Sequence, residues 1–187
     1  MILTDYFLSE PSLAWQLAKQ AGVRHAVVRL PEDEAFDMTD PAHIRAVAER
    51  FKAEGLRPLV VEPMPNSVHD HIKRGDSLRD ASIEKVLQMI PLLAENGFTT
   101  ICTNFVAEVG WYRTRSDYPE RGGALATAFC LEDAKIDPSL TVSEQGSGTG
   151  FRIFWTPWFR RRSAAASALR CTRTTRPCKS SADSAGF

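Results

Sequence analysis

The hydrophobic and polar positions of the first 105 residues repeat one pattern three times: an amphipathic helix, a glycine and a short run suited to a β-strand. Apolar residues spaced three and four apart predict helices with one buried face. Two such faces are Ile44, Val47, Ala48 and Phe51, and Ile83, Val86, Leu87, Ile90 and Leu93. The strands predicted after the glycines are 25–30, 58–62 and 99–105. With 2–7 as a first strand, the order is βαβαβαβ.

Local signals mark the ends of these helices. Gly22, Gly55 and Gly97 stand where a helix ends in a left-handed residue. Asp40-Pro41 combines an N-cap with proline at the first helical position. Alternating helices and strands predict a parallel sheet, which is either half of a barrel or a small open sheet. A complete eightfold barrel needs more than 187 residues.

The pattern stops near residue 146. Residues 1–145 hold 15 Lys and Arg against 22 Asp and Glu, whereas residues 146–187 hold 8 against 1. The net charge of zero therefore combines about −7 and +7. Because the later segment has neither helical nor strand periodicity, it offers no face to bury. We expect a domain over 1–145 and an irregular tail over 146–187 that is not a domain.

Composition restricts the function classes. The chain is 43% apolar and 25% charged, a normal balance for a globular protein. Its first residues, Met1 to Asp5, lack a basic leader, and no apolar run approaches the ~18 residues of a membrane span. We expect a cytoplasmic protein without a membrane partner. The spacing of the four cysteines fits neither a zinc pair nor a disulfide framework, so free thiols are expected.

Candidate chemistry lies in the loops after the strands, where α/β proteins bind ligands. His69-Asp70-His71 could supply metal ligands or a proton-transfer pair, or be a solvated loop. Trp111 to Arg115 places guanidinium groups beside aromatic rings, which suits the carboxylate and hydroxyls of a sugar acid, or forms a basic turn. Asn104 ends a strand and could bind a ligand or cap the backbone. The acidic run 32–34 is typical of a solvated face.

Three segments carry a family resemblance. Val68 to Lys73, Cys102 to Phe105 and Trp111 to Thr114 resemble the VHEDIK, CYNF and WTRT stretches of the mannonate dehydratases, sugar-acid lyases on a xylose-isomerase-like TIM barrel. Residues 123–129 resemble the segment that follows, and the likeness covers roughly 1–145. Three positions depart from it, because Asp70 replaces Glu, His71 replaces Asp and Tyr112 replaces Thr.

The resemblance implies the fold, the reaction and the site. It implies the N-terminal half of a (β/α)8 barrel, with about four parallel strands, from an enzyme of hexuronate catabolism that converts D-mannonate to 2-keto-3-deoxygluconate and water. The family uses Mn²⁺ or Fe²⁺, whose ligands, like the acid/base residues, lie beyond the point where the likeness ends. We therefore expect no catalytic residue and no bound metal in this chain, which is then inactive. Substrate contacts are assigned to His69, Asn104, Trp111 and Arg113, and the intact protein could be a homo-oligomer.

The tail is consistent with translation in a shifted frame. The family's next strand ends in HPDDPP, with a metal-binding histidine, whereas this chain has Cys171 to Pro177. Codons read one base earlier across Arg170 to Pro177 permit LHPDDPP, with histidine or tyrosine forced at Cys171/Thr172. Phe154/Trp155 and Trp155/Thr156 permit only Leu and Asp, which fit the family's preceding helix. These positions predict a frameshift near Gln145.

Two other functions stay open. Another sugar isomerase or epimerase on the same barrel would share the repeated helix and strand pattern. A genuine arginine-rich tail would instead suggest a non-enzymatic protein that binds nucleic acid or an acidic surface. The frameshift hypothesis predicts no nucleic-acid partner and a small sugar acid as the ligand of the family.

Overall fold

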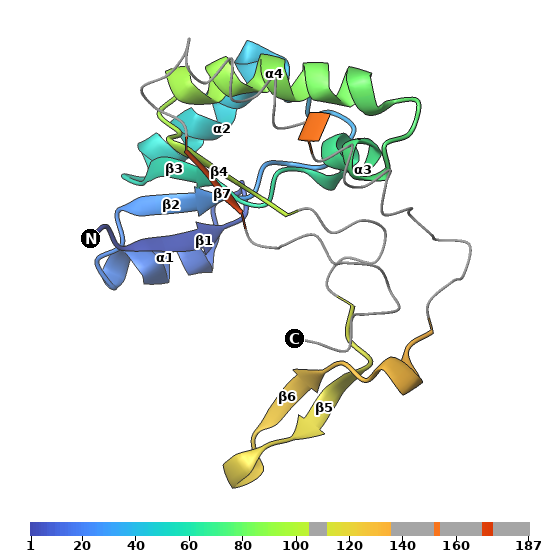
Figure 1. The fold of residues 1–187 in the computed structure, drawn as a ribbon. Helices are drawn as coiled ribbons and strands as arrows, with labels where there is room; N and C mark the ends of the chain where they lie inside the picture. The colour runs from blue at the N-terminus through green and yellow to red at the C-terminus, as the bar shows by residue number, and fades with distance from the viewer. Residues whose placement is uncertain (105–111, 136–151, 154–169, 174–187) are drawn as a thin grey trace.

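The main part of the chain is a parallel β-sheet, seen in a computed structural model that describes residues 1–104, 112–135, 152–153 and 170–173. The strand order is β1-β2-β3-β4-β7 (Figure 1). The strands are β1 (Thr4–Phe7), β2 (His25–Val28), β3 (Arg57–Val61), β4 (Thr100–Thr103) and β7 (Arg170–Arg173). The first four confirm the predicted strands and their parallel order, and β7 joins them from the tail.

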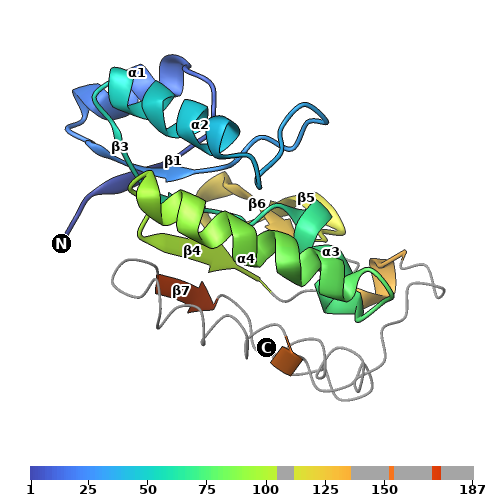
Figure 2. The same cartoon turned by 90° about the horizontal axis from the view of Figure 1, so that it is seen from above.

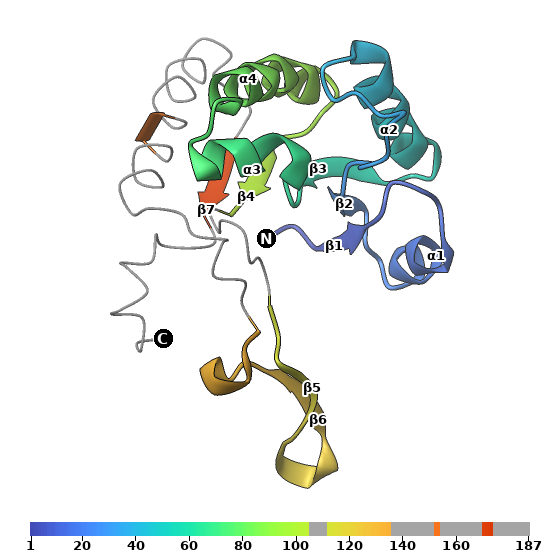
Figure 3. The ribbon, with the colours of Figure 1, turned by 90° about the vertical axis from the view of Figure 1, so that its right-hand side faces the viewer.

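The helices cover the outer side of this curved sheet. They are α1 (Leu13–Gln20), α2 (Pro41–Ala53), α3 (Asn66–Arg74) and α4 (Arg79–Glu95). Seen from the side in Figure 3, the strands follow an arc with α1, α2 and α4 outside it, and Figure 2 shows α4 running along β4. This is the helix and strand arrangement of part of a (β/α)8 barrel, as the sequence predicted.

Aromatic side chains fill the core between the sheet and the first two helices. Phe7 of β1, Trp15 of α1 and Phe51 of α2 are each at most 2% exposed. The Trp15 and Phe51 rings stack with centroids 4.1 Å apart, and the Phe7 ring meets Trp15 edge-on at 5.8 Å. The predicted faces of α2 and α4 are buried in the same core. The periodicity of the sequence therefore identified the buried faces correctly.

The helix ends follow the local signals. The Asp40 carboxylate accepts a hydrogen bond of 2.7 Å from the Ala42 amide, and Pro41 is the first residue of α2. Gly97, which follows α4, has φ of +99°, a left-handed conformation that side chains with a Cβ rarely adopt. The predicted caps are confirmed at both positions.

One prediction about an irregular segment is wrong. The stretch after β3, predicted as a loop through Lys73, contains helix α3 from Asn66 onward. Within the tail, residues 170–173 form β7 in parallel register with β4, with Ile101 opposite Cys171. The backbone groups of an exposed strand edge pair with any suitable extended segment, so apolar periodicity is not required for a strand there.

A hairpin extends away from the sheet (Figure 1). It consists of antiparallel strands β5 (Arg115–Pro119) and β6 (Leu125–Ala128), with short 3-10 turns at Arg121–Gly123 and Leu131–Asp133. Every residue of β5 is exposed. Among the described residues, no helix combines the length and apolar character needed to cross a bilayer.

Candidate functional site

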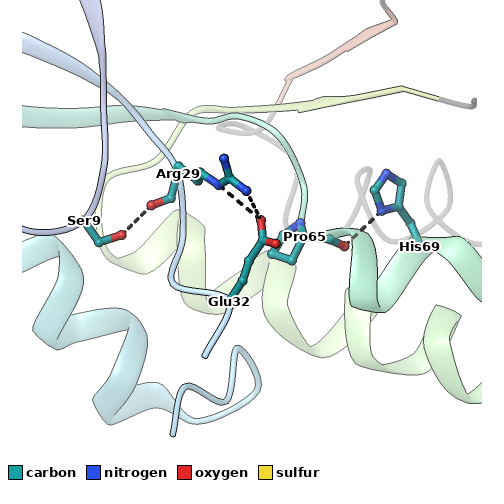
Figure 4. Close-up of polar contacts among 5 residues, drawn as sticks. All are labelled: Ser9, Arg29, Glu32, Pro65 and His69. Atoms are coloured by element: carbon teal, nitrogen blue, oxygen red, sulfur yellow. Dashed lines mark hydrogen bonds and ion pairs between the residues drawn. The ribbon is translucent and has the colours of Figure 1, made fainter. Parts of the chain in front are cut away.

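The carboxyl ends of the strands are joined to one another by hydrogen bonds. Ser9, which follows β1 and is buried, donates from its hydroxyl to the Arg29 carbonyl after β2 (Figure 4). The Met64 amide after β3 donates to the Cys102 carbonyl in β4 at 3.0 Å. These bonds fix the loops of neighbouring strands relative to each other, which is what a preformed binding site requires.

The acidic run after β2 is a solvated face, as the sequence indicated. Glu32 accepts two hydrogen bonds from the Arg29 guanidinium at 3.1 and 3.2 Å (Figure 4). A hydrogen bond with Tyr6, followed by the charge of Glu32, raises the pKa of Arg29. Asp33 accepts from the Ala35 amide within its own turn, and all three acidic residues are exposed. These contacts account for the acidic run without a ligand.

Helix α3 places His69 in the protein interior. The side chain is 2% exposed, and Nδ1 lies 2.9 Å from the Pro65 carbonyl oxygen one turn earlier (Figure 4). Because a carbonyl only accepts, Nδ1 carries the proton and Nε2 carries a lone pair. Nε2 is fully buried and has no hydrogen-bond partner among the residues that the structure describes. Burial, followed by the nearby charge of Lys73, lowers the pKa of His69 to about 4, so the imidazole is neutral at physiological pH.

The triplet His69-Asp70-His71 does not act as one cluster. Asp70 contacts Lys73, with Oδ1 3.2 Å from Nζ, whereas His71 contacts Asp76 at 2.7 Å. On a helix, residues two apart point to different sides, so His69 and His71 cannot share a ligand through this spacing. Across the part of the chain that the structure describes, no three His, Cys, Asp or Glu side chains are placed to hold a metal ion. The donor set of these residues does not fit the metal of the family.

Lys73 is a site residue that the sequence interpretation missed. It is 2% exposed and follows His69 by four residues on the same helical face. Burial lowers the pKa of its ammonium, and the Asp70 carboxylate opposes this effect. A helical assignment for 66–74 would have revealed the shared face, since residues four apart on a helix are neighbours.

The other predicted contacts lie on two different segments. Asn104 directly follows β4 and is half-buried. Arg113 precedes the hairpin, is exposed and donates to the Tyr112 carbonyl at 3.0 Å. Trp111 lies outside the described residues. The structure thus places His69 in the helix after β3 and Asn104 directly after the adjacent strand β4. The substrate roles of all four residues stay predictions.

Comparison with known proteins matches this chain to mannonate dehydratases. Residues 3–143 match the D-mannonate dehydratase (UxuA) family. The mannonate dehydratase of Lactococcus lactis subsp. cremoris is 31% identical over 76% of this chain and 40% of its own length. That of Streptococcus uberis is 34% identical over 66% of this chain and 34% of its own.

Solved structures show the same fold. The crystal structure of mannonate dehydratase from Streptococcus suis serotype 2 superposes with a TM-score of 0.74 at 22% identity, covering 91% of this chain and 53% of that one. A D-psicose 3-epimerase gives a TM-score of 0.50 at 12% identity, covering 90% of this chain and 51% of that one. The chain spans about 40% or less of the length of these curated relatives and about half of the solved structures.

Proposed function

The chain belongs to the D-mannonate dehydratase family, and we propose that it is the substrate-contacting part of a lyase that removes water from D-mannonate to give 2-keto-3-deoxygluconate. The observation that carries this proposal is the family match over 3–143, which spans all four predicted strands and the loops after them. The family match stops before the tail, where the charge and periodicity of the chain change.

The described residues are suited to binding and orienting a sugar acid. Dehydration beside a carboxylate requires a base for the proton, an acid for the departing hydroxyl and a cation for the developing charge. In the family that cation would be Mn²⁺ or Fe²⁺, and the described side chains offer no donor set that fits either ion. His69 presents a neutral acceptor and Arg113 a guanidinium, both suited to hydroxyls or a carboxylate.

The proposal includes a one-base shift of the reading frame near Gln145. It is supported by the forced codon pairs around Trp155 and by the shifted reading LHPDDPP across Arg170 to Pro177. Correcting the shift defines the frame-restored protein, in which the family's metal ligands and acid/base residues would follow residue 145. The chain with its present tail should then be inactive, and the protein would act on a sugar acid in the cytoplasm.

An assay on D-mannonate tests this function. The frame-restored protein, supplied with Mn²⁺ or Fe²⁺, should form a 2-keto-3-deoxy acid, and the present chain should not. Isomerisation or epimerisation without that product would favour another sugar enzyme of the same barrel and refute the proposal. Resequencing the DNA between the codons for Glu144 and Thr149 tests the frameshift separately.

Arg113 offers a matched test of substrate contact. Arg113→Ala should raise KM by roughly 10- to 100-fold through loss of a charge-assisted hydrogen bond. Arg115→Ala is the control, because Arg115 already pairs with Asp133 at 3.0 Å on the hairpin. Equal KM values for both variants would remove Arg113 from the site.

A further inference from the structure

The buried face of α3 combines a base with a cation. His69 and Lys73 are each 2% exposed, and they stand one helical turn apart, where side chains are neighbours. Helix α3 follows β3 at the carboxyl end of the sheet, the side on which barrels of this architecture bind ligands (Figure 1). The pair therefore belongs to the helix that follows β3 at this end of the sheet.

Both side chains have unused hydrogen-bonding capacity. His69 donates from Nδ1–H to the Pro65 carbonyl (Figure 4). Its Nε2 has a lone pair that receives no donor from the described part of the chain. The Lys73 ammonium has three N–H donors, and Asp70 Oδ1, at 3.2 Å, is the acceptor that the described residues give it. A buried polar atom without a partner is uncommon in folded proteins and calls for an explanation.

An internal ion pair explains only part of this arrangement. The Lys73 and Asp70 pair has the i,i+3 spacing common on helices, and the Asp70 side chain is 36% exposed. This contact with Asp70 gives Lys73 a structural role within α3. It does not supply a donor for His69 Nε2, because a carboxylate at neutral pH only accepts.

We propose that His69 and Lys73 form a subsite for an α-hydroxycarboxylate, in which the Lys73 ammonium donates to the carboxylate and His69 Nε2 accepts from the hydroxyl on the adjacent carbon. This rests on the proposed function, since D-mannonate carries this group at its first two carbons. Lys73 then takes the carboxylate, and Arg113 is left for the more distant hydroxyls. The low pKa of His69, which burial causes, keeps the acceptor lone pair available at neutral pH.

The first test follows the imidazole nitrogens of the full chain by NMR with ¹⁵N-labelled histidine. D-mannonate should shift the unprotonated Nε2 resonance of His69 and leave the resonances of the half-buried His43, on a different helix, in place. D-mannitol lacks the carboxylate and 2-deoxy-D-gluconate lacks the hydroxyl, so each should bind roughly 10- to 100-fold more weakly. Equal binding of the three compounds, or an unmoved His69 signal at the highest soluble ligand concentration, would overturn the proposal.

Variants separate binding from folding. Lys73→Met should weaken D-mannonate binding roughly 10- to 100-fold, whereas Lys19→Met, at the exposed Glu54 pair, should not. His69→Asn can keep the bond to the Pro65 carbonyl but lacks the acceptor at Nε2, and it should lose binding. His69→Gln can place an amide oxygen near the Nε2 position and should retain part of it. Tryptophan fluorescence reports whether each variant is folded. If folded Lys73→Met and His69→Asn bind D-mannonate as tightly as the parent chain, the two residues have only a structural role and the proposal is wrong.

The outcome is distinguishable from failure of the proposed function. If the frame-restored protein forms no 2-keto-3-deoxy acid but the His69 resonance responds to α-hydroxy acids, the subsite stands and the dehydratase assignment is wrong. If the frame-restored protein dehydrates D-mannonate, and Lys73→Met and His69→Asn leave its KM unchanged, the dehydratase assignment stands and the subsite is wrong.

Discussion

Acidification from pH 7 to pH 4 should destabilise the folded chain through one side chain, His69. In the folded chain burial, followed by the charge of Lys73, lowers the pKa of this imidazole from its ordinary 6.5 to about 4. Between these two values the unfolded chain binds a proton that the folded chain does not. The free energy of unfolding therefore rises with pH across this window, is fully gained above pH 6.5 and is lost as pH falls toward 4.

The structure sets the size of the effect. At about 1.4 kcal/mol for each unit of pKa, the contribution of His69 amounts to about 3 kcal/mol. This is a large part of the roughly 10 kcal/mol by which a folded domain is typically stabilised. Among the described residues, the pKa values of Asp37 and Asp76 are lowered from 3.8, so these carboxylates add a loss of stability that begins near about pH 5 and falls mostly below pH 4. The pKa of Lys73, lowered from 10.5, affects alkaline stability.

Urea unfolding at a series of pH values between 4 and 7, followed by tryptophan fluorescence, measures this slope. Trp15 is 1% exposed and reports on the core. His69→Asn, which can preserve the bond to Pro65, should flatten the dependence between pH 4 and 6.5. His43→Asn is the comparison, because it removes a half-buried imidazole on a different helix, near Asp40. A His69→Asn slope equal to that of the parent chain would refute the assignment of a buried neutral imidazole.

Three further changes test the fold by urea unfolding at neutral pH. Asp40→Ala removes the N-cap of α2 and should lower the free energy of unfolding by about 1 kcal/mol. Asp40→Asn, which can still cap the helix, should keep most of that stability. Equal free energies of unfolding for the two variants would exclude a capping role. Phe51→Ala removes the ring stacked on Trp15 and should lower the free energy of unfolding by about 3–5 kcal/mol. Phe51→Leu should lower it clearly less. A loss below about 1 kcal/mol for Phe51→Ala would contradict a tightly packed aromatic core. Gly97→Ala forces a Cβ into a left-handed residue and should cost about 1–2 kcal/mol although space is available, so a neutral effect would argue against that φ value.

The repeated units were predictable because short-range physics determines them. The face of α2 that contains Ile44 and Phe51 is buried in the core, and the Asp40 cap lies where the dipeptide Asp40-Pro41 predicted it. Parallel pairing also followed, since alternating helices and strands leave few other topologies. Family-specific segments after the strands then indicated the family, which the match over 3–143 confirms.

The site was less predictable because burial depends on packing between segments far apart in sequence. Val68, His69, Ile72 and Lys73 form a buried face of α3, but two of these four residues are polar and conceal the apolar stripe of a helix. The adjacent His69 and His71 suggested a shared ligand, whereas the helix directs them to different partners, Pro65 and Asp76. Knowledge that 66–74 is helical was needed to see that Lys73 shares a face with His69.

Strand β7 adds a structural expectation to the frameshift proposal. It pairs with β4 in the next position of the sheet, with Thr172 opposite Cys102. A parallel ladder forms between backbone groups and does not depend on the reading frame of the side chains. In the shifted reading, the codon pair Cys171/Thr172 would encode histidine or tyrosine, so the histidine of LHPDDPP would enter this same strand beside β4. Replacing that histidine with alanine in the frame-restored protein should weaken its affinity for the metal. An unchanged metal affinity would show that the histidine of this strand is not a metal ligand.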